Sequence, residues 1–224
     1  MERPAPRGHD ASRAVRLGGI AWILGVVQFL IAMVAVQLAW THPYNPLQNA
    51  VSDLGAVSCR ENAMGTSFVC SPWHVLFNVS IIVFGILVAA GAVAVRPALP
   101  PGRVARCGVA VLVVAGIGAA LVGIFPEDVQ GVAHSLGALL AFVGSSAALI
   151  LLGIAMSGRP AWAGFRALSL GCGIFSGGVI IASNLSENWG PVGFGGLERL
   201  IVAPALLWLF VVGVRLSRGT SLEG

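Results

Sequence analysis

The sequence predicts an all-α membrane protein, a polytopic bundle of six transmembrane helices. Of the 224 residues, 57% are hydrophobic and only 10% are charged, whereas a soluble domain carries about 25% charged residues. The apolar residues come in long blocks, and a block of about 18 or more is typical of a membrane span. Because so few charges cannot cover a water-facing surface, most of the surface must face lipid.

Six blocks are long enough to span a membrane, and charges occur only at their edges. In chain order the predicted spans are residues 17–40, 73–95, 105–125, 132–156, 167–184 and 197–214. Together they form one domain, residues 17–214, between an N-terminal tail of residues 1–16 and a C-terminal tail of residues 215–224. The first block is too long for the apolar region of a signal peptide, and no small-residue cleavage site follows it.

Glycines in two of the spans indicate close helix packing, because small residues let backbones approach in lipid. They are Gly108, Gly116, Gly118 and Gly123 in the third span, and Gly171, Gly173, Gly177 and Gly178 in the fifth.

Arginine placement predicts the orientation of the bundle. All 13 basic residues are arginine. Eleven lie in the two tails, in the loops that follow the second and fourth spans, or, for Arg106, at the adjoining edge of the third span, and only Arg60 and Arg199 lie on the other side. The positive-inside rule therefore places both termini in the cytoplasm and loop 41–72 outside, as in a multi-pass plasma-membrane protein. Arginines spread in small groups do not form a phosphate-binding patch, so we expect no nucleic-acid partner.

Two of the four cysteines, Cys59 and Cys70, fall in the long outer loop. The outside of a bacterial cell is oxidising, so we predict a disulfide between them, with two free thiols as the alternative. Cys107 and Cys172 lie near the cytoplasmic ends of their spans and are interpreted as small apolar residues.

Uncommon polar residues gather on the predicted extracytoplasmic side, and they define a candidate site. We predict Asp53, His74, Glu127 and His134 as catalytic residues, and Asn49, Ser52, Asn78, Glu198 and Arg199 as substrate-binding residues. If the fourth helix starts near Pro126, His134 lies about two turns into it. An ionisable group within a span costs about 2.5–3.5 kcal/mol at the bilayer centre, so His134 is expected to point into the bundle.

The acidic residues also have structural interpretations. Glu127 and Asp128 follow Pro126, which is typical of a helix start with acids in its first turn. Glu198 likewise fits the start of the sixth span, and Glu198 and Arg199 together fit the membrane interface.

The remaining candidates have structural alternatives of their own. Ser52 and Asp53 are typical cap residues for a short helix or turn. His74 follows a tryptophan, as in an aromatic belt at the membrane surface. For His134 the alternative is a buried polar contact, since burial there requires a hydrogen-bond partner.

We expect no metal, because no local ligand spacing brings the histidines together. If zinc were bound, His74, His134 and Asp53 would be its ligands. A metal-free histidine and carboxylate pair for proton transfer is the competing interpretation.

Four segments in combination resemble the bacterial DUF998 family of integral membrane proteins. They are residues 49–55 (Asn-Ala-Val-Ser-Asp-Leu-Gly), residues 70–78, residues 125–127 followed by His134, and residues 196–200 before the last span. The resemblance covers residues 17–214. The family is distantly similar in layout to the six-span Frag/DRAM/Sfk group, one branch of which remodels lipid anchors. A looser similarity is to the ceramidase and adiponectin-receptor class, whose paired histidines in the last span this chain lacks.

Several functions are consistent with these residues. The first is a lipid-modifying or lipid-hydrolysing enzyme, in which His134 or His74 acts as general acid or base and Asp53 orients it. Its partners would be membrane lipids or a lipid-like apolar substrate, with Arg199 holding an anionic head group. The alternative is a non-catalytic protein that binds a lipid or a partner. Further alternatives are a small terpenoid cyclase and a transporter, although the broken spans of transporters are not evident.

Overall fold

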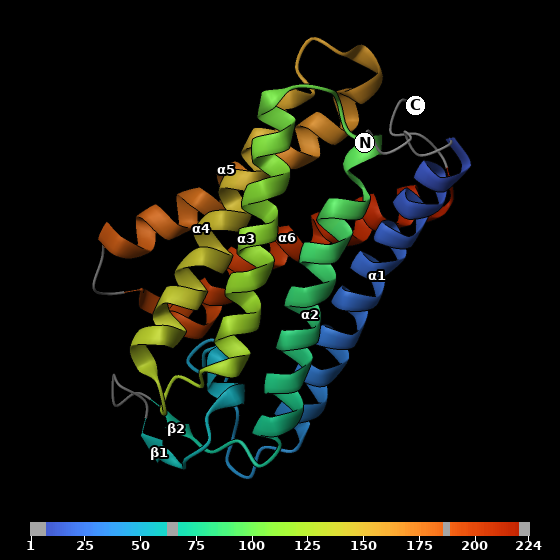
Figure 1. Cartoon of the computed structure of the whole chain (residues 1–224). Helices are drawn as coiled ribbons and strands as arrows, with labels where there is room; N and C mark the ends of the chain where they lie inside the picture. Colours follow the sequence, from blue (N-terminus) through green and yellow to red (C-terminus); the bar gives the residue numbers. More distant parts are fainter. Residues whose placement is uncertain (1–7, 62–66, 186–188, 220–224) are drawn as a thin grey trace.

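The computed structural model of the chain is a bundle of six long helices with a folded loop at one end (Figure 1). It describes residues 8–61, 67–185 and 189–219, so part of each predicted tail (residues 1–7 and 220–224) lies outside the described residues. The long helices are α1 (Gly8–Leu38), α2 (His74–Ala94), α3 (Arg103–Ile124), α4 (Gly131–Ala155), α5 (Ala163–Leu185) and α6 (Gly193–Ser217).

Each long helix satisfies the physical requirements of a membrane span. All six have the length and the hydropathy to cross a bilayer. Large apolar side chains point outward from them, and Ile31, Ile181 and Leu185 are 64%, 64% and 82% exposed. Such a surface is stable against lipid but not against water. The predicted six-span membrane bundle is therefore confirmed.

The helix bounds differ most from the prediction at the N-terminus. Helix α1 begins at Gly8, inside the predicted tail. The reason is that residues 11–16 contain helix-forming alanine and arginine and no glycine or proline. The helix therefore continues beyond its apolar block, with Arg13 and Arg16 exposed.

Consecutive helices pack side by side, and α1 also packs against α6, so the bundle closes into a ring. Glycines mark the tightest contacts. A Cβ atom added at Gly85 of α2 would lie 2.3 Å from the carbonyl oxygen of Gly116 in α3, and one at Gly118 would lie 2.7 Å from that of Gly137 in α4. These contacts confirm the packing role of the third-span glycines.

In the fifth span the prediction for glycine is only partly right. Gly173 lies against α4, where an added Cβ would be 2.8 Å from the carbonyl oxygen of Ser146. Nothing lies within 4 Å of an added Cβ at Gly171 or Gly178. Both glycines are exposed, and Gly171 borders an open groove between α5 and α6 rather than a tight contact.

The two ends of the bundle have different character (Figure 1). The first residues of α1 and the last residues of α6 lie together at one end, which we call the tail end. The segment between α1 and α2 covers the opposite end, which we call the loop end. It contains the 3-10 helix η1 (Ser52–Gly55) and the antiparallel strands β1 (Arg60–Glu61) and β2 (Phe68–Val69). Shorter 3-10 helices are η2 (Arg96–Ala98), η3 (Pro160–Trp162) and η4 (Gly190–Val192).

Candidate functional site beneath the loop

Helix α6 holds the first part of the loop through Arg199. Its Nη1 atom donates to the carbonyl oxygens of Pro46 at 2.7 Å and Asn49 at 2.8 Å, and Nη2 donates to the hydroxyl of Tyr44. The guanidinium carbon also lies 5.7 Å from the centre of the Tyr44 ring. Burial raises the pKa of Tyr44 to about 12, against the opposing effect of Arg199. The described guanidinium contacts thus go to the protein itself, and Arg199 fastens the loop to α6.

Helix α2 holds the next part of the loop, around η1. Asn78 donates from Nδ2 to the carbonyl oxygen of Gly55 at 2.9 Å. Just before α2, the hydroxyl of Ser71 donates to the carbonyl oxygen of Leu54 at 2.6 Å. The contact is so close that a Cβ at Gly55 would lie 2.3 Å from Oδ1 of Asn78. These bonds satisfy the carbonyls at the end of η1, where no helix continues.

The hairpin of β1 and β2 is tied to the segment between α3 and α4. A disulfide joins Cys59 to Cys70, as predicted. Between these cysteines, Arg60 forms an ion pair with Glu127, with Nη2 and Oε1 2.8 Å apart. Asp128 accepts hydrogen bonds from the amide of Ser58 at 2.7 Å and from its hydroxyl at 2.6 Å. Burial raises the pKa of Asp128, but these bonds outweigh it and hold the pKa below its usual value.

The carboxyl group of Asp53 lies at the centre of this loop and is only 4% exposed. Its Oδ2 atom accepts from Nδ2 of Asn49 at 3.2 Å and from the amide of Ala50 at 3.0 Å. Burial, and then the nearby carboxylate of Glu127, raise the pKa of Asp53 to about 7 from its usual 3.8. The Glu127 carboxylate has this effect because two negative charges at close range repel each other and so favour the protonated form of Asp53.

Beneath η1 an apolar cavity of about 70 Å³ opens between the helices. Phe29, Phe77, Phe84 and Phe142 contribute aromatic walls. Three polar side chains also line it, namely Ser52, His134 and Glu198. The amide of Val51 donates to Oε2 of Glu198, which ties this end of α6 to η1. An apolar cavity with a few convergent polar groups is the usual form of a small-molecule site.

The ring of His134 is held in one orientation beside this cavity. Its Nδ1 atom lies 2.9 Å from the carbonyl oxygen of Phe125. A carbonyl oxygen can only accept a hydrogen bond, so Nδ1 carries a proton, and in the neutral form of the ring Nε2 is the acceptor. A neutral imidazole fixed in this way has the arrangement of a general base.

The structure brings together most, but not all, of the predicted site residues. Asn49, Asp53 and Glu127 form a contiguous group in and beside the loop, and Ser52, His134 and Glu198 meet at the cavity. His74 is separate from that cavity: it begins α2, and its Nδ1 atom lies 3.0 Å from the carbonyl oxygen of Ser71.

The conditional zinc ligands are not assembled. Within residues 8–61, 67–185 and 189–219, no three His, Cys, Asp or Glu side chains are grouped so as to hold a metal ion. The set of His74, His134 and Asp53 is therefore not a cluster in this structure. The geometry offers proton-transfer groups instead.

Two expectations about α4 are corrected. The helix begins at Gly131 and has no acidic residue in its first turn, so Glu127 and Asp128 do not start it. Residues 126–130 form a separate turn, closed by the amide of Gln130 on the carbonyl oxygen of Pro126. The backbone at Gln130 leaves the helical region, with φ −137° and ψ 61°. His134 consequently lies in the first turn of α4 rather than two turns into it.

Some site residues were missed from the sequence. The cavity phenylalanines have the same apolar character as lipid-facing residues, and no pattern in the sequence separates the two groups. Tyr44 carried a usable signal, because it is the only tyrosine in the chain and lies in the loop with the other polar candidates.

The fold and site together define a polytopic membrane bundle with an apolar cavity, bordered by a few polar side chains, under a disulfide-closed loop. A family model described as "Protein of unknown function (DUF998)" matches residues 23–215. The chain belongs to this family, as its motifs indicated. No curated protein and no solved structure matches the chain.

Proposed function

We propose that the protein is a membrane enzyme that hydrolyses an acyl ester or amide of a lipid or lipid-like molecule. One observation carries the proposal: an imidazole with a fixed tautomer lines an apolar, aromatic-walled cavity together with a carboxyl and a hydroxyl group. The cavity suits a hydrocarbon chain, and the polar groups lie where the head of such a molecule would sit.

In this reaction, Nε2 of His134 takes a proton from a water molecule. The oxygen of that water attacks the acyl carbonyl carbon, and the bond to the alcohol or amine breaks. The protonated imidazole then returns the proton to the leaving group, so the enzyme is restored. Ser52 lines the same cavity, and in this proposal its hydroxyl donates a hydrogen bond to the substrate.

A second candidate is a protein that binds a lipid without changing it. The observation in its favour is that several polar side chains are used to hold the loop. Arg199 fastens residues 44–49, Glu198 accepts from Val51, and Asp128 accepts from Ser58. Both candidates require an occupied cavity, and they differ only in whether His134 transfers a proton.

Turnover of lipids by the purified protein distinguishes the two. The protein is placed in vesicles that contain acyl esters and acyl amides, and mass spectrometry follows the lipids over time. We expect a hydrolysis product whose rate falls at least about 100-fold in His134→Gln. The matched control is His74→Gln, because His74 lies off the cavity, and its rate should match that of the unaltered protein.

Two results would overturn the enzyme proposal. One is a His134→Gln protein that keeps its full rate. The other is the absence of any product from the unaltered protein while lipid still co-purifies with it, which would establish the binding candidate.

A further inference from the structure

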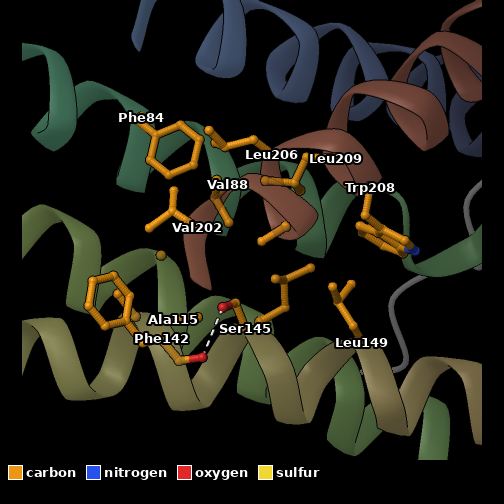
Figure 2. A pocket seen from close by; sticks show the side chains of 14 residues that line it. Phe84, Val88, Ala115, Phe142, Ser145, Leu149, Val202, Leu206, Trp208 and Leu209 are labelled. Atoms are coloured by element: carbon orange, nitrogen blue, oxygen red, sulfur yellow. Dashed lines mark hydrogen bonds between the residues drawn. The ribbon is translucent and has the colours of Figure 1, made fainter. Parts of the chain in front are cut away.

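A second apolar cavity, of about 60 Å³, continues below the first toward the tail end of the bundle. The two cavities share three lining residues, Phe84 of α2, Phe142 of α4 and Val202 of α6. Figure 2 shows Phe84 and Phe142 at one end of the lower cavity, and Trp208 and Leu149 at the other. The cavities are therefore adjacent, and one side chain from each of α2, α4 and α6 borders both of them.

The residues that line both cavities follow a single face of each helix. On α4 they are His134, Ala138, Ala141, Phe142, Ser145 and Leu149. Apart from the neighbours Ala141 and Phe142, consecutive members are three or four residues apart, which is about one helical turn. Such spacing places side chains one above another along the helix. The two cavities consequently form one line along the bundle, with the polar groups at the loop end.

The length of this line is that of a long hydrocarbon chain. His134 and Leu149 are fifteen residues apart, which is about 22 Å at the rise of an α-helix. Half of a bilayer's hydrocarbon core is only about 15 Å. The described lining of the lower part is almost entirely apolar, and the hydroxyl of Ser145 is already bonded to the carbonyl oxygen of Phe142 at 3.1 Å.

The width of the line admits one chain and not two. The two cavities have volumes of about 60 and 70 Å³, too small for a long chain unless the side chains between them move aside. An occupant that spans both cavities has to displace Phe84, Phe142 or Val202, the residues that line both. A lipid with two acyl chains would require the packed helices to separate.

The polar end selects against an anionic head group. Glu198 borders the cavity, and its Oε2 atom already accepts a hydrogen bond from the amide of Val51. The nearby cation Arg199 donates to the loop carbonyls of Pro46 and Asn49. Carboxylate and imidazole acceptors instead match hydroxyl, amide or ammonium donors.

We propose that the joined cavities bind an amphiphile with one long linear chain and a small, uncharged or cationic head that bears hydrogen-bond donors. This inference rests on the proposed function for its biological use, and it names the substrate class of that site. The head lies beneath η1, and the chain passes between Phe84, Phe142 and Val202 toward Leu149 and Leu209.

Photo-crosslinking maps the chain directly. The probe is an N-acylethanolamine of long chain length, which has one chain and an uncharged head, with a diazirine at the chain terminus. A second probe carries the diazirine next to the amide. In the unaltered protein the terminal diazirine should label the peptides that contain Leu149 and Leu209, and the other should label those around His134.

Two variants on the same helix form a matched pair. Ala205 lines the lower cavity, whereas Ala203 is exposed and borders the open groove between α5 and α6, away from both cavities. Ala205→Phe should reduce terminal labelling in the lower cavity to background, while Ala203→Phe should leave it unchanged. Excess free fatty acid of the same chain length should compete poorly, and a two-chain phospholipid probe should label outward-facing residues such as Leu207.

The inference fails if the terminal diazirine labels only outward-facing residues of the unaltered protein, a result that does not depend on how the variants fold. It also fails if the fatty acid competes as well as the uncharged probe. Measuring labelling and turnover in the same proteins separates this inference from the proposed function. If the unaltered protein and His134→Gln are both labelled and neither hydrolyses lipid, hydrolysis is refuted and the binding site for the chain still stands.

Discussion

Arg199 of α6 donates a hydrogen bond of 2.8 Å to the carbonyl oxygen of Asn49, which is 150 residues earlier in the chain. The same guanidinium also reaches Pro46, Tyr44 and the carbonyl of Gly195 in its own helix. One rigid side chain thus sets the position of the segment that precedes η1. The position of the loop over the cavity is therefore set by the first turns of α6.

Replacing Arg199 with lysine should loosen this attachment. A lysine keeps the charge but lacks the planar set of donors that bonds several carbonyls at once, so we expect a loss of about 2 kcal/mol in stability. The measurements are the thermal denaturation midpoint in detergent and the rate of limited proteolysis within residues 41–58. Arg166→Lys, on an exposed residue near the tail end, is the control and should change neither.

Gly55→Ala should displace η1 from α2. Its Cβ would lie 2.3 Å from Oδ1 of Asn78, and overpacking of this kind costs about 1–3 kcal/mol. Asn78→Ala should remove part of the conflict, so the double variant should be more stable than the sum of the two single changes predicts. Gly131→Ala, where an added Cβ meets nothing within 4 Å, serves as the control. Strict additivity in thermal unfolding would contradict this account.

Asp53 should make the protein less stable as the pH rises. Its pKa is 3.8 in the unfolded chain and about 7 in the folded one, because of burial first and Glu127 second. Between these values the folded state holds a proton that the unfolded state has released. The free energy of unfolding therefore falls from about pH 4 to about pH 7, by at most about 4 kcal/mol, and then levels off.

Asp53→Asn should flatten that slope. Asparagine offers an oxygen to Asn49 and Ala50 and an amide to Glu127, so it resembles the protonated acid. Denaturation at a series of pH values checks this. Asp128→Asn is the control: the lowered pKa of Asp128 means that its contribution is lost only as the pH falls below this range. A slope that survives in Asp53→Asn would show that another group titrates there.

Opening the disulfide should release the hairpin and, with it, the ion pair between Arg60 and Glu127. A disulfide that closes a loop of this size contributes about 3 kcal/mol. Here we expect it to stabilise the folded conformation of the loop rather than the helices. Cys59→Ser with Cys70→Ser should speed proteolysis within the loop and leave the helical content unchanged. Cys107→Ser, on a free and exposed cysteine, should have no effect. Equal proteolysis of all variants would show that other contacts hold the hairpin.

The sequence was sufficient to predict the helices because hydrophobic blocks of span length have one stable arrangement in lipid. It was also sufficient for the disulfide, since both cysteines lie in one loop. Partners of the polar side chains were harder to predict. Glu127 and Asp128 have the pattern of a helix start, but their contacts are with Arg60 and Ser58, far away in the chain. Arg199 is similar: its charge suggested a ligand, and its contacts are loop carbonyls.

The cavity itself could not be predicted from the sequence. Phe84 and Phe142 line it, whereas Phe175 and Phe210 are exposed on the outer surface, and all four occur in equally apolar stretches. In a soluble helix, polar residues on one face would reveal which side is buried. In lipid both faces are apolar, so only the packing of the helices decides which phenylalanine meets a ligand.

The attachment of the loop to α6 has a consequence for how the protein is made. Residues 41–58 leave the ribosome well before residues 193–199, yet Leu47, Asn49 and Val51 are bonded to that last helix. The loop therefore cannot form these hydrogen bonds until α6, the final span, has entered the bilayer. A chain truncated after α5 would keep five inserted helices, but the loop between α1 and α2 would lack its bonding partners on α6 and could not adopt its position over the cavity.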